Sequence, residues 1–302
     1  MKNIILIPIL LVSLILKAQI PQSSNLVGEY KFNTNTNDTS GNAYNGQTFG
    51  APTLVQDRFG NSNAAYSLDG VDDYLYFGNS MLSEWTYEPN GFIMESFTIS
   101  LWAKSSLSAS ETLLAFGEDL GCCYFGMVTY ISTHVIMNSS NFPFYSNNSG
   151  VNTSGKGYDG QWHHYVVVWD YDTGYRRVYI DGALAGQYQQ VESGNILKRF
   201  KISNYGLAVG RDRYRPSDPT NIGNTYTGSV DEVRIWNTDL SSADISSLYS
   251  YDNNSANYQP TIFNVVNRYG KPTSTAGEQL NQFGQVGVGN SYVNKNGKII
   301  SF

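Results

Sequence analysis

The sequence is short of the residues that cross-link a protein or stiffen its linkers. Its 302 residues include only 2 cysteines and 9 prolines, and 15% of the residues are charged. Two cysteines exclude a framework of several disulfides and any metal site built from spaced cysteine pairs. The chain is instead rich in glycine (29) and tyrosine (23). Glycines together with aromatic and β-branched residues favour turns and strands over helices.

Long apolar runs are also absent beyond the N-terminus. Residues 4–16 are apolar and follow Lys2, but a helix that crosses a bilayer needs about 20 such residues. Because the run ends at a small residue, Ala18, we expect residues 1–18 to be a secretory signal peptide. The alternative is a retained anchor, which no second apolar segment supports. We therefore expect a secreted, cell-surface or periplasmic protein without membrane insertion.

Basic residues are outnumbered once this peptide is removed. Cleavage takes Lys2 and Lys17 from the 19 basic residues, so 17 remain against 25 acidic residues, a net charge of −8. This charge disfavours nucleic acids and anionic membrane surfaces as partners. It is compatible with calcium and with neutral sugars.

The two cysteines, Cys122 and Cys123, are neighbours in the chain. In an oxidising compartment they should not stay free, and a disulfide between them would stiffen the loop that carries them. The alternative is a pair of partly buried thiols without a role.

Strand patterns recur along residues 26–236. In residues 97–104, apolar Phe97, Ile99 and Leu101 alternate with residues of the opposite face. The Asp181-Gly182 pair between two strand patterns predicts a β-hairpin. Many short strands separated by turns predict an all-β fold, a two-sheet antiparallel jelly-roll sandwich.

One short helix is predicted after the last strand, with Ser241 or Ser242 as its N-cap and Ile245, Leu248 and Tyr249 at helical spacing. We expect it to lie across the edge of the sandwich.

The C-terminal segment differs in texture from the rest of the chain. It contains a near-repeat, VNRYGK at residues 266–271 and VNKNGK at residues 293–298, and each copy is typical of a strand that ends in a turn. We interpret residues 256–302 as a short β appendage or a docking tail. Two such units are too few for a repeat array.

Seven motifs stand in one order within residues 25–251: GEYKF (28–32), DTSGN (38–42), LDGVDDY (68–74), FTISLW (97–102), WHHYVV (162–167), VYIDG (178–182) and GSVDEVRIWN (228–237). In this order they resemble a laminin-G-like domain of the concanavalin A-like jelly-roll superfamily. The resemblance implies a two-sheet jelly roll that binds glycans or proteins outside the cell, often with a calcium ion at the rim. Some members of the superfamily are glycoside hydrolases.

Asp231 and Glu232 are adjacent acids in the last of these motifs. Strict alternation would place Asp231 on the same face as Val233 and Ile235, at the inner edge of the core, and Arg234 on the other face. A buried carboxylate needs a cation or several donors. We therefore expect a calcium ion at Asp231, and the alternative is a carboxylate held by loop amides. The resemblance adds Asp38 as a second ligand and Asn45 to the surrounding shell.

The remaining acids of these motifs and the histidine pair can each be interpreted in two ways. Glu232 is expected to form an exposed ion pair with Arg234, since acids on opposite faces cannot act on one glycosidic bond. The DGVDDY stretch reads as turn chemistry, with a metal site as the alternative. Of His163 and His164, one is expected to be structural and the other exposed.

Candidate ligand-binding residues are Tyr124, Tyr130, Arg211 and Tyr214, because aromatic rings stack on sugars and polar groups bind their hydroxyls. The leading interpretation is a secreted, non-catalytic module for binding glycans or for cell adhesion, with structural calcium. A carbohydrate-active enzyme on the same fold and a purely structural surface protein that docks other proteins are the alternatives.

Overall fold

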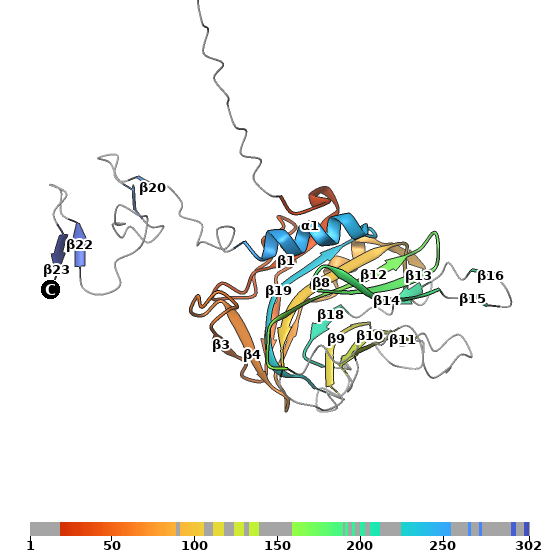
Figure 1. The fold of residues 1–302 in the computed structure, drawn as a ribbon, viewed down its shortest axis with the longest axis horizontal. Helices are drawn as coiled ribbons and strands as arrows, with labels where there is room; N and C mark the ends of the chain where they lie inside the picture. Colours follow the sequence, from red (N-terminus) through yellow and green to blue (C-terminus); the bar gives the residue numbers. More distant parts are fainter. Residues whose placement is uncertain are drawn as a thin grey trace, which may run out of the picture. The chain divides into compact units, whose positions relative to one another are not determined.

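Two antiparallel sheets pack face to face over most of the computed structural model (Figure 1). The structure describes residues 19–88, 91–105, 111–117, 124–129, 133–138, 159–189, 191–192, 195–196, 200–202, 206–211, 225–254, 265–266, 272–273, 291–293 and 299–301. Side chains are described within residues 19–85, 95–105, 111–115, 159–189, 206–211 and 225–254. The predicted jelly-roll class is confirmed by this two-layer arrangement.

The larger sheet has eight strands in the order β14-β13-β12-β8-β19-β4-β3, and β1 also pairs with β19. Their bounds are β1 (Leu26–Tyr30), β3 (Thr53–Val55), β4 (Ala65–Asp69), β8 (Phe97–Lys104), β12 (His163–Asp170), β13 (Tyr175–Ile180), β14 (Ala183–Gln189) and β19 (Thr227–Trp236). β19 lies in the middle and contacts β8, β4 and β1.

The second sheet has six strands in the order β11-β10-β9-β18-β5-β2. Its strands are β2 (Gln47–Phe49), β5 (Tyr74–Tyr76), β9 (Glu111–Gly117), β10 (Tyr124–Thr129), β11 (Thr133–Asn138) and β18 (Leu207–Val209). Smaller elements are η1 (Ser23–Asn25), η2 (Ser80–Glu84), the sheet of β6 (Thr86–Glu88), β7 (Gly91–Met94) and β17 (Phe200–Ile202), and the pair β15 (Val191–Glu192) and β16 (Asn195–Ile196).

The space between the sheets is filled as the alternation predicted. Phe97, Ile99 and Leu101 of β8 are fully buried in the inner core, together with Val167 of β12 and Val233 of β19. The predicted hairpin is also present, because β13 and β14 pair on either side of Asp181-Gly182.

Helix α1 (Ser242–Asp252) lies on the outer face of the eight-stranded sheet (Figure 1). Ser241 caps it: its hydroxyl accepts from the Asp244 backbone N–H at 3.1 Å, and the Asp244 carboxylate accepts from the Ser241 N–H at 3.1 Å. This reciprocal arrangement is a capping box. Ile245 and Leu248 pack on a second apolar cluster that includes Trp236. The predicted helix is therefore present, but its expected position at the sandwich edge is wrong, since the outer sheet face itself is apolar.

The chain divides into two units, residues 1–251 and 252–302. Within the second unit, β20 (Val265–Val266) pairs with β21 (Pro272–Thr273), and β22 (Ser291–Val293) pairs with β23 (Ile299–Ser301). Each copy of the near-repeat thus begins on a strand whose partner follows the copy. None of the described helices is long and apolar enough to cross a membrane.

Candidate functional site

Two of the predicted calcium ligands, Asp38 and Asn45, lie together in the loop after β1. The Asp38 carboxylate accepts backbone N–H groups of Glu29 (3.0 Å), Ser40 (2.8 Å) and Tyr44 (3.0 Å), and Asn45 Oδ1 accepts the Asp38 N–H at 3.0 Å. Both oxygens of Asp38 accept backbone N–H groups in this way, from its own loop and from β1.

Asp231, the third predicted ligand, lies on the opposite side of its strand from the expected one. Val233 and Ile235 do belong to the inner core. Glu232, however, has a positive φ of 50°, and the pairing of β19 with β8 shifts between Asp231 and Arg234. This β-bulge adds a residue and breaks the alternation. Asp231 therefore faces outward beside its cross-strand partner Trp102, and the expectation that it shares a face with Val233 is wrong.

Arg58 supplies the positive charge beside Asp231. Its Nη1 donates to Asp231 Oδ2 at 2.8 Å, and both side chains are buried. The guanidinium also lies over the Trp102 ring, 4.4 Å from its centroid. Burial, and then the nearby Glu232 carboxylate, raise the pKa of Asp231, while Arg58 opposes that shift. The charge of Asp231 is thus met by an arginine that the sequence analysis did not predict as its partner.

A second group of buried charges lies beside it on β1 and β19. Arg234 contacts Glu232 (Nη2–Oε2 2.5 Å) and Glu29 (Nε–Oε1 3.0 Å), and Lys31 lies 3.3 Å from Glu29. Burial would raise the pKa of Glu29, but Arg234 and Lys31 outweigh it and hold this pKa below its usual value. The predicted pair of Glu232 and Arg234 is therefore present, but it is buried instead of exposed.

The DGVDDY turn at the end of β4 gathers three carboxylates. Asp69, Asp72 and Asp73 each offer an oxygen within 4.8 Å of the others, and Asp73 is buried. Asp73 accepts from the Ala51 N–H (2.6 Å) and the Asp69 N–H (3.1 Å). Asp69 accepts from the Val71 N–H, and this backbone hydrogen bond is the main cause of a lowered Asp69 pKa. The turn reading and the metal reading are both compatible with this geometry, because carboxylate oxygens retain lone pairs for a hard cation.

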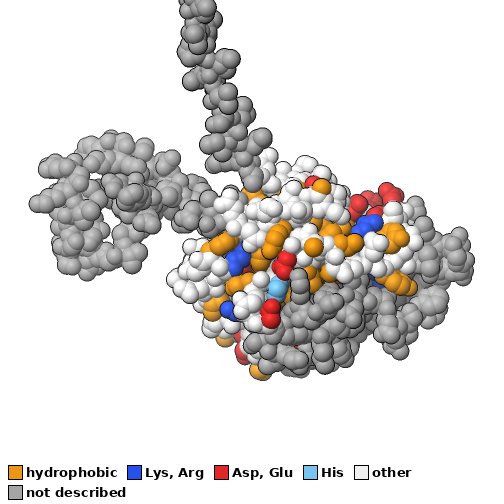
Figure 2. Space-filling view, viewed as in Figure 1, with side chains coloured by type: hydrophobic (Ala, Val, Ile, Leu, Met, Phe, Trp, Pro, Cys, Tyr) orange, Lys and Arg blue, Asp and Glu red, His pale blue; other side chains and the backbone are white. Residues whose placement is uncertain are grey.

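His163 lies between two acids at the same end of the sandwich. Its Nδ1 is 2.8 Å from Asp181 Oδ2, and its Nε2 is 3.1 Å from Asp159 Oδ2. Hydrogen bonding to Asp181 is the main cause of a raised His163 pKa, with Asp159 contributing and burial opposing. Figure 2 shows a histidine at the surface with acidic side chains on both sides. His164 instead is buried and stacks on Trp102, with ring centroids 5.2 Å apart.

Of the predicted ligand-binding residues, Arg211 is the one whose side chain lies in the described part of the chain. Arg211 is 0% exposed and lies over Tyr74, 4.4 Å from its ring centroid. Tyr124 begins β10 opposite Gly117, whereas Arg211 follows β18 towards the other end of the sheet. The Tyr124 side chain lies outside the described residues, as do Tyr130, Tyr214 and the two cysteines, Cys122 and Cys123.

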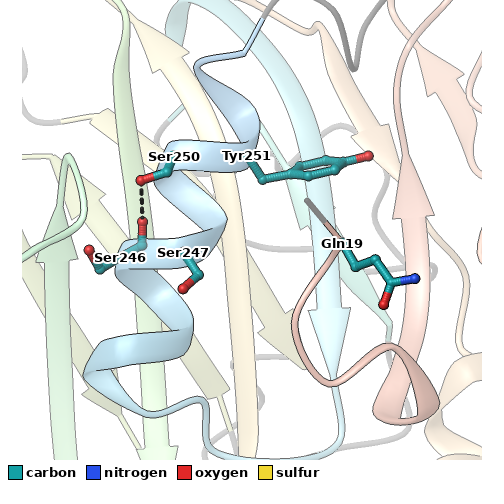
Figure 3. A pocket seen from close by; sticks show the side chains of 5 residues that line it. All are labelled: Gln19, Ser246, Ser247, Ser250 and Tyr251. Carbon is teal, nitrogen blue, oxygen red and sulfur yellow. Dashed lines mark hydrogen bonds between the residues drawn. The ribbon is translucent and has the colours of Figure 1, made fainter. Parts of the chain in front are cut away.

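A pocket of about 450 Å³ lies between α1 and the segment that leads into η1. Figure 3 shows Tyr251 and Gln19 on the same side of the helix, and the other lining residues are Ser246, Ser247 and Ser250. Ser250 Oγ donates to the Ser246 carbonyl at 2.9 Å. The pocket is therefore lined by three serines, one glutamine and one tyrosine, and the Ser250 hydroxyl is already bonded within the helix. Sequence reasoning missed this pocket, although the serines of residues 246–250 recur on the side of the helix away from Ile245 and Leu248.

Comparison with protein families gives the class of this fold. The laminin-G-type model of the concanavalin A-like lectin/glucanases superfamily matches residues 69–246, more than half of the chain. The chain therefore belongs to this superfamily, as its motifs predicted.

Solved structures with the same fold come from several kinds of protein. Domain 4 of AbnA, a GH43 extracellular arabinanase from Geobacillus stearothermophilus, matches with a TM-score of 0.53 and 21% identity, over 74% of this chain and 98% of that one. The receptor binding domain of botulinum neurotoxin D matches with a TM-score of 0.55 and 18% identity, over 83% and 56%. A Trypanosoma rangeli sialidase matches with a TM-score of 0.52 and 16% identity, over 78% and 34%. At these identities the likeness concerns the fold alone.

Among curated proteins, the chain is 32% identical over 94 residues to the Sushi, von Willebrand factor type A, EGF and pentraxin domain-containing protein 1 of Rattus norvegicus. The match covers 30% of this chain, and the chain spans only 2% of the length of that relative.

Proposed function

We propose that the chain is an exported, non-catalytic carbohydrate-binding module. The observation that carries this proposal is the pocket beside α1, whose lining residues are three serines, Gln19 and Tyr251. Membership of a superfamily of lectins and glucanases supports it. So does the fold-level likeness to AbnA domain 4, which was solved in complex with arabinotriose.

The pocket suits a small saccharide on chemical grounds. Sugar hydroxyls both donate and accept hydrogen bonds, as do serine hydroxyls and a glutamine amide. Sugar C–H faces pack on aromatic rings, and Tyr251 offers such a ring. A volume of about 450 Å³ falls in the usual range of small-molecule sites, roughly 300–1,000 Å³.

A binding role is favoured over hydrolysis by the state of the central acids. Glycoside hydrolysis needs two carboxyl groups that flank the bond to be cleaved. Glu232 and Asp231 are both buried and each contacts an arginine. In the DGVDDY turn, Asp69 and Asp73 accept backbone N–H groups. These contacts fit structural roles.

Export, adhesion to a cell surface and a structural calcium ion complete the proposal. Export rests on residues 1–18, which lie outside the described residues. For calcium, the fit of the residues favours Asp69, Asp72 and Asp73, because three carboxylates there offer oxygens within 4.8 Å of one another. An ion there would fix the turn between β4 and β5.

The test is calorimetric titration of the full chain with arabinotriose. We expect binding that weakens about 2–10-fold in Gln19→Ala, the loss expected for one hydrogen bond, and also weakens in Tyr251→Ala, which removes the ring. Gln56→Ala, which removes an amide elsewhere on the chain, is the matched control and should bind like the wild type. Absence of binding to arabinotriose and to a broad panel of neutral oligosaccharides would reject the proposal, and release of reducing sugar from polysaccharides would reject its non-catalytic part.

A further inference from the structure

Four side chains form a row across the inner face of the eight-stranded sheet. Phe97 on β8 pairs with Trp169 on β12, Trp169 pairs with Arg176 on β13, and Arg176 pairs with Tyr188 on β14. Cross-strand partners point to the same face, and Phe97 and Trp169 belong to the inner core. We call these four residues the inner-face row. Its last member, Tyr188, is 39% exposed, so the row leads from the core to solvent at the β14 edge.

Arg176 is the unusual member of this row, because its charge is buried and no described residue supplies a counter-charge. It is 5% exposed, and its Nε has no hydrogen-bond partner there. Among the described residues, no carboxylate forms an ion pair with it, and its guanidinium lies 5.9 Å from the Tyr188 ring centroid. Burial lowers its pKa to about 10. A buried charge without a partner is costly, so its retention needs a reason.

The neighbouring arginine shows what a structural pairing looks like here. Arg177 points to the other face, where its Nη1 lies 3.0 Å from Asp170 Oδ2. Two adjacent arginines on one strand thus differ in their pairing as well as in their face: within the described part of the chain, Arg177 has a carboxylate partner and Arg176 has none. This contrast points to an anion from outside the chain as the partner of Arg176.

We propose that Arg176 and Tyr188 form a binding site for the carboxylate of an acidic saccharide. The planar guanidinium fork matches the two oxygens of a carboxylate. The half-exposed Tyr188 ring beside it offers a face on which the sugar ring packs. The choice of a saccharide rests on the proposed function above, whereas the choice of a carboxylate rests on Arg176. Uronic acids and nonulosonic acids share this chemistry.

The test titrates the full chain with trigalacturonate, with its methyl ester and with N-acetylneuraminic acid. We expect at least one of the two acids to bind, and the ester to bind at least 10-fold more weakly than trigalacturonate if the uronic acid is the ligand. Arg176→Met should weaken acid binding at least 10-fold and leave arabinotriose binding unchanged. Arg177→Met, the matched control one residue along, should bind the acid like the wild type.

Folding of the variant is part of the same test. Since the described residues give Arg176 no ion-pair partner to lose, Arg176→Met should unfold at the same urea concentration as the wild type or a higher one. If it fails to fold, Tyr188→Ala on the edge strand replaces it, and weaker acid binding is again expected. Unchanged acid binding in the folded variant overturns the proposal. Binding of arabinotriose but of neither acid overturns this proposal alone, and binding of no saccharide at all overturns the proposed function with it.

Discussion

Arg58 and Asp231 are 173 positions apart in the sequence, and their side chains meet at 2.8 Å on the outer face of the central sheet. Both are buried, and Trp102 forms the floor beneath the guanidinium. The pair joins the segment after β3 to the bulge in β19. Asp231, which the sequence predicts to be a metal ligand, thus pairs with an arginine that is distant in the sequence.

Removing one partner of this pair should be strongly destabilising. Arg58→Met leaves Asp231 buried and uncompensated, and we expect a loss of about 3–5 kcal/mol in the free energy of unfolding. The double variant Arg58→Met with Asp231→Leu should recover much of that loss, because no isolated charge remains. Urea unfolding of the two single variants and the double variant gives the coupling energy. Additive losses would show that the two side chains do not depend on each other.

The tight turn between β13 and β14 gives a second prediction. Gly182 has a φ of 76°, and a Cβ there would lie 2.9 Å from the Tyr249 Cβ of α1. Gly60 has a similar φ of 84°, but a Cβ at Gly60 would meet nothing within 4 Å. Gly60→Ala should therefore cost about 1–2 kcal/mol from backbone strain alone.

Gly182→Ala should cost more, since overpacking adds about 1–3 kcal/mol to the same strain. Thermal unfolding of the two variants measures the difference between them. Equal losses would mean that the hairpin moves away from α1 at no cost, and that the contact with Tyr249 does not fix its position.

His163 predicts a pH dependence with a definite sign. Asp181 and Asp159 raise its pKa in the folded state above the unfolded value of about 6.5. A raised histidine pKa contributes stability that is fully present below the unfolded pKa and is lost as the pH rises through the folded pKa. The difference in melting temperature between the wild type and His163→Gln should therefore be larger at about pH 5.5 than at about pH 9. A difference that does not change with pH would indicate that His163 acts through packing alone.

The sequence correctly predicted the structural features that depend on residues close together in the chain. The alternation in β8, the Asp181-Gly182 hairpin and the helix capped by Ser241 all follow from local patterns, and all are present. The bulge at Glu232 depends on how β19 pairs with β8, so strict alternation placed Asp231 on the wrong face. The Arg58 partner depends on which loops the fold brings together, and residues 173 positions apart give no local signal.

Local sequence patterns also could not predict which outer-face residues of the sheet are buried. Trp102 alternates with the core residues of β8 and so lies on the opposite face of the strand, yet it is 3% exposed. It is buried because Arg58 and Tyr249 cover it. Helix α1, which was expected at the sandwich edge, instead covers the outer face of the eight-stranded sheet. Local sequence patterns do not show that this face is apolar, because its residues come from several strands.

Calcium binding at the DGVDDY turn can be tested against a control substitution in the loop after β1. If Asp69, Asp72 and Asp73 hold the ion, calcium should raise the melting temperature of the wild type relative to chelator, since a ligand that binds only the folded state stabilises it by about 2.7 kcal/mol at 100 times its Kd. Asp72→Asn should lose most of this shift, because Asp72 is exposed and its substitution removes a ligand at little cost to the fold. Asp38→Asn should lower the melting temperature with and without calcium, because Asp38 holds its own loop, and should keep the shift. A shift lost in Asp38→Asn and kept in Asp72→Asn would move the ion to the loop after β1, and no shift in the wild type would remove calcium from the proposal.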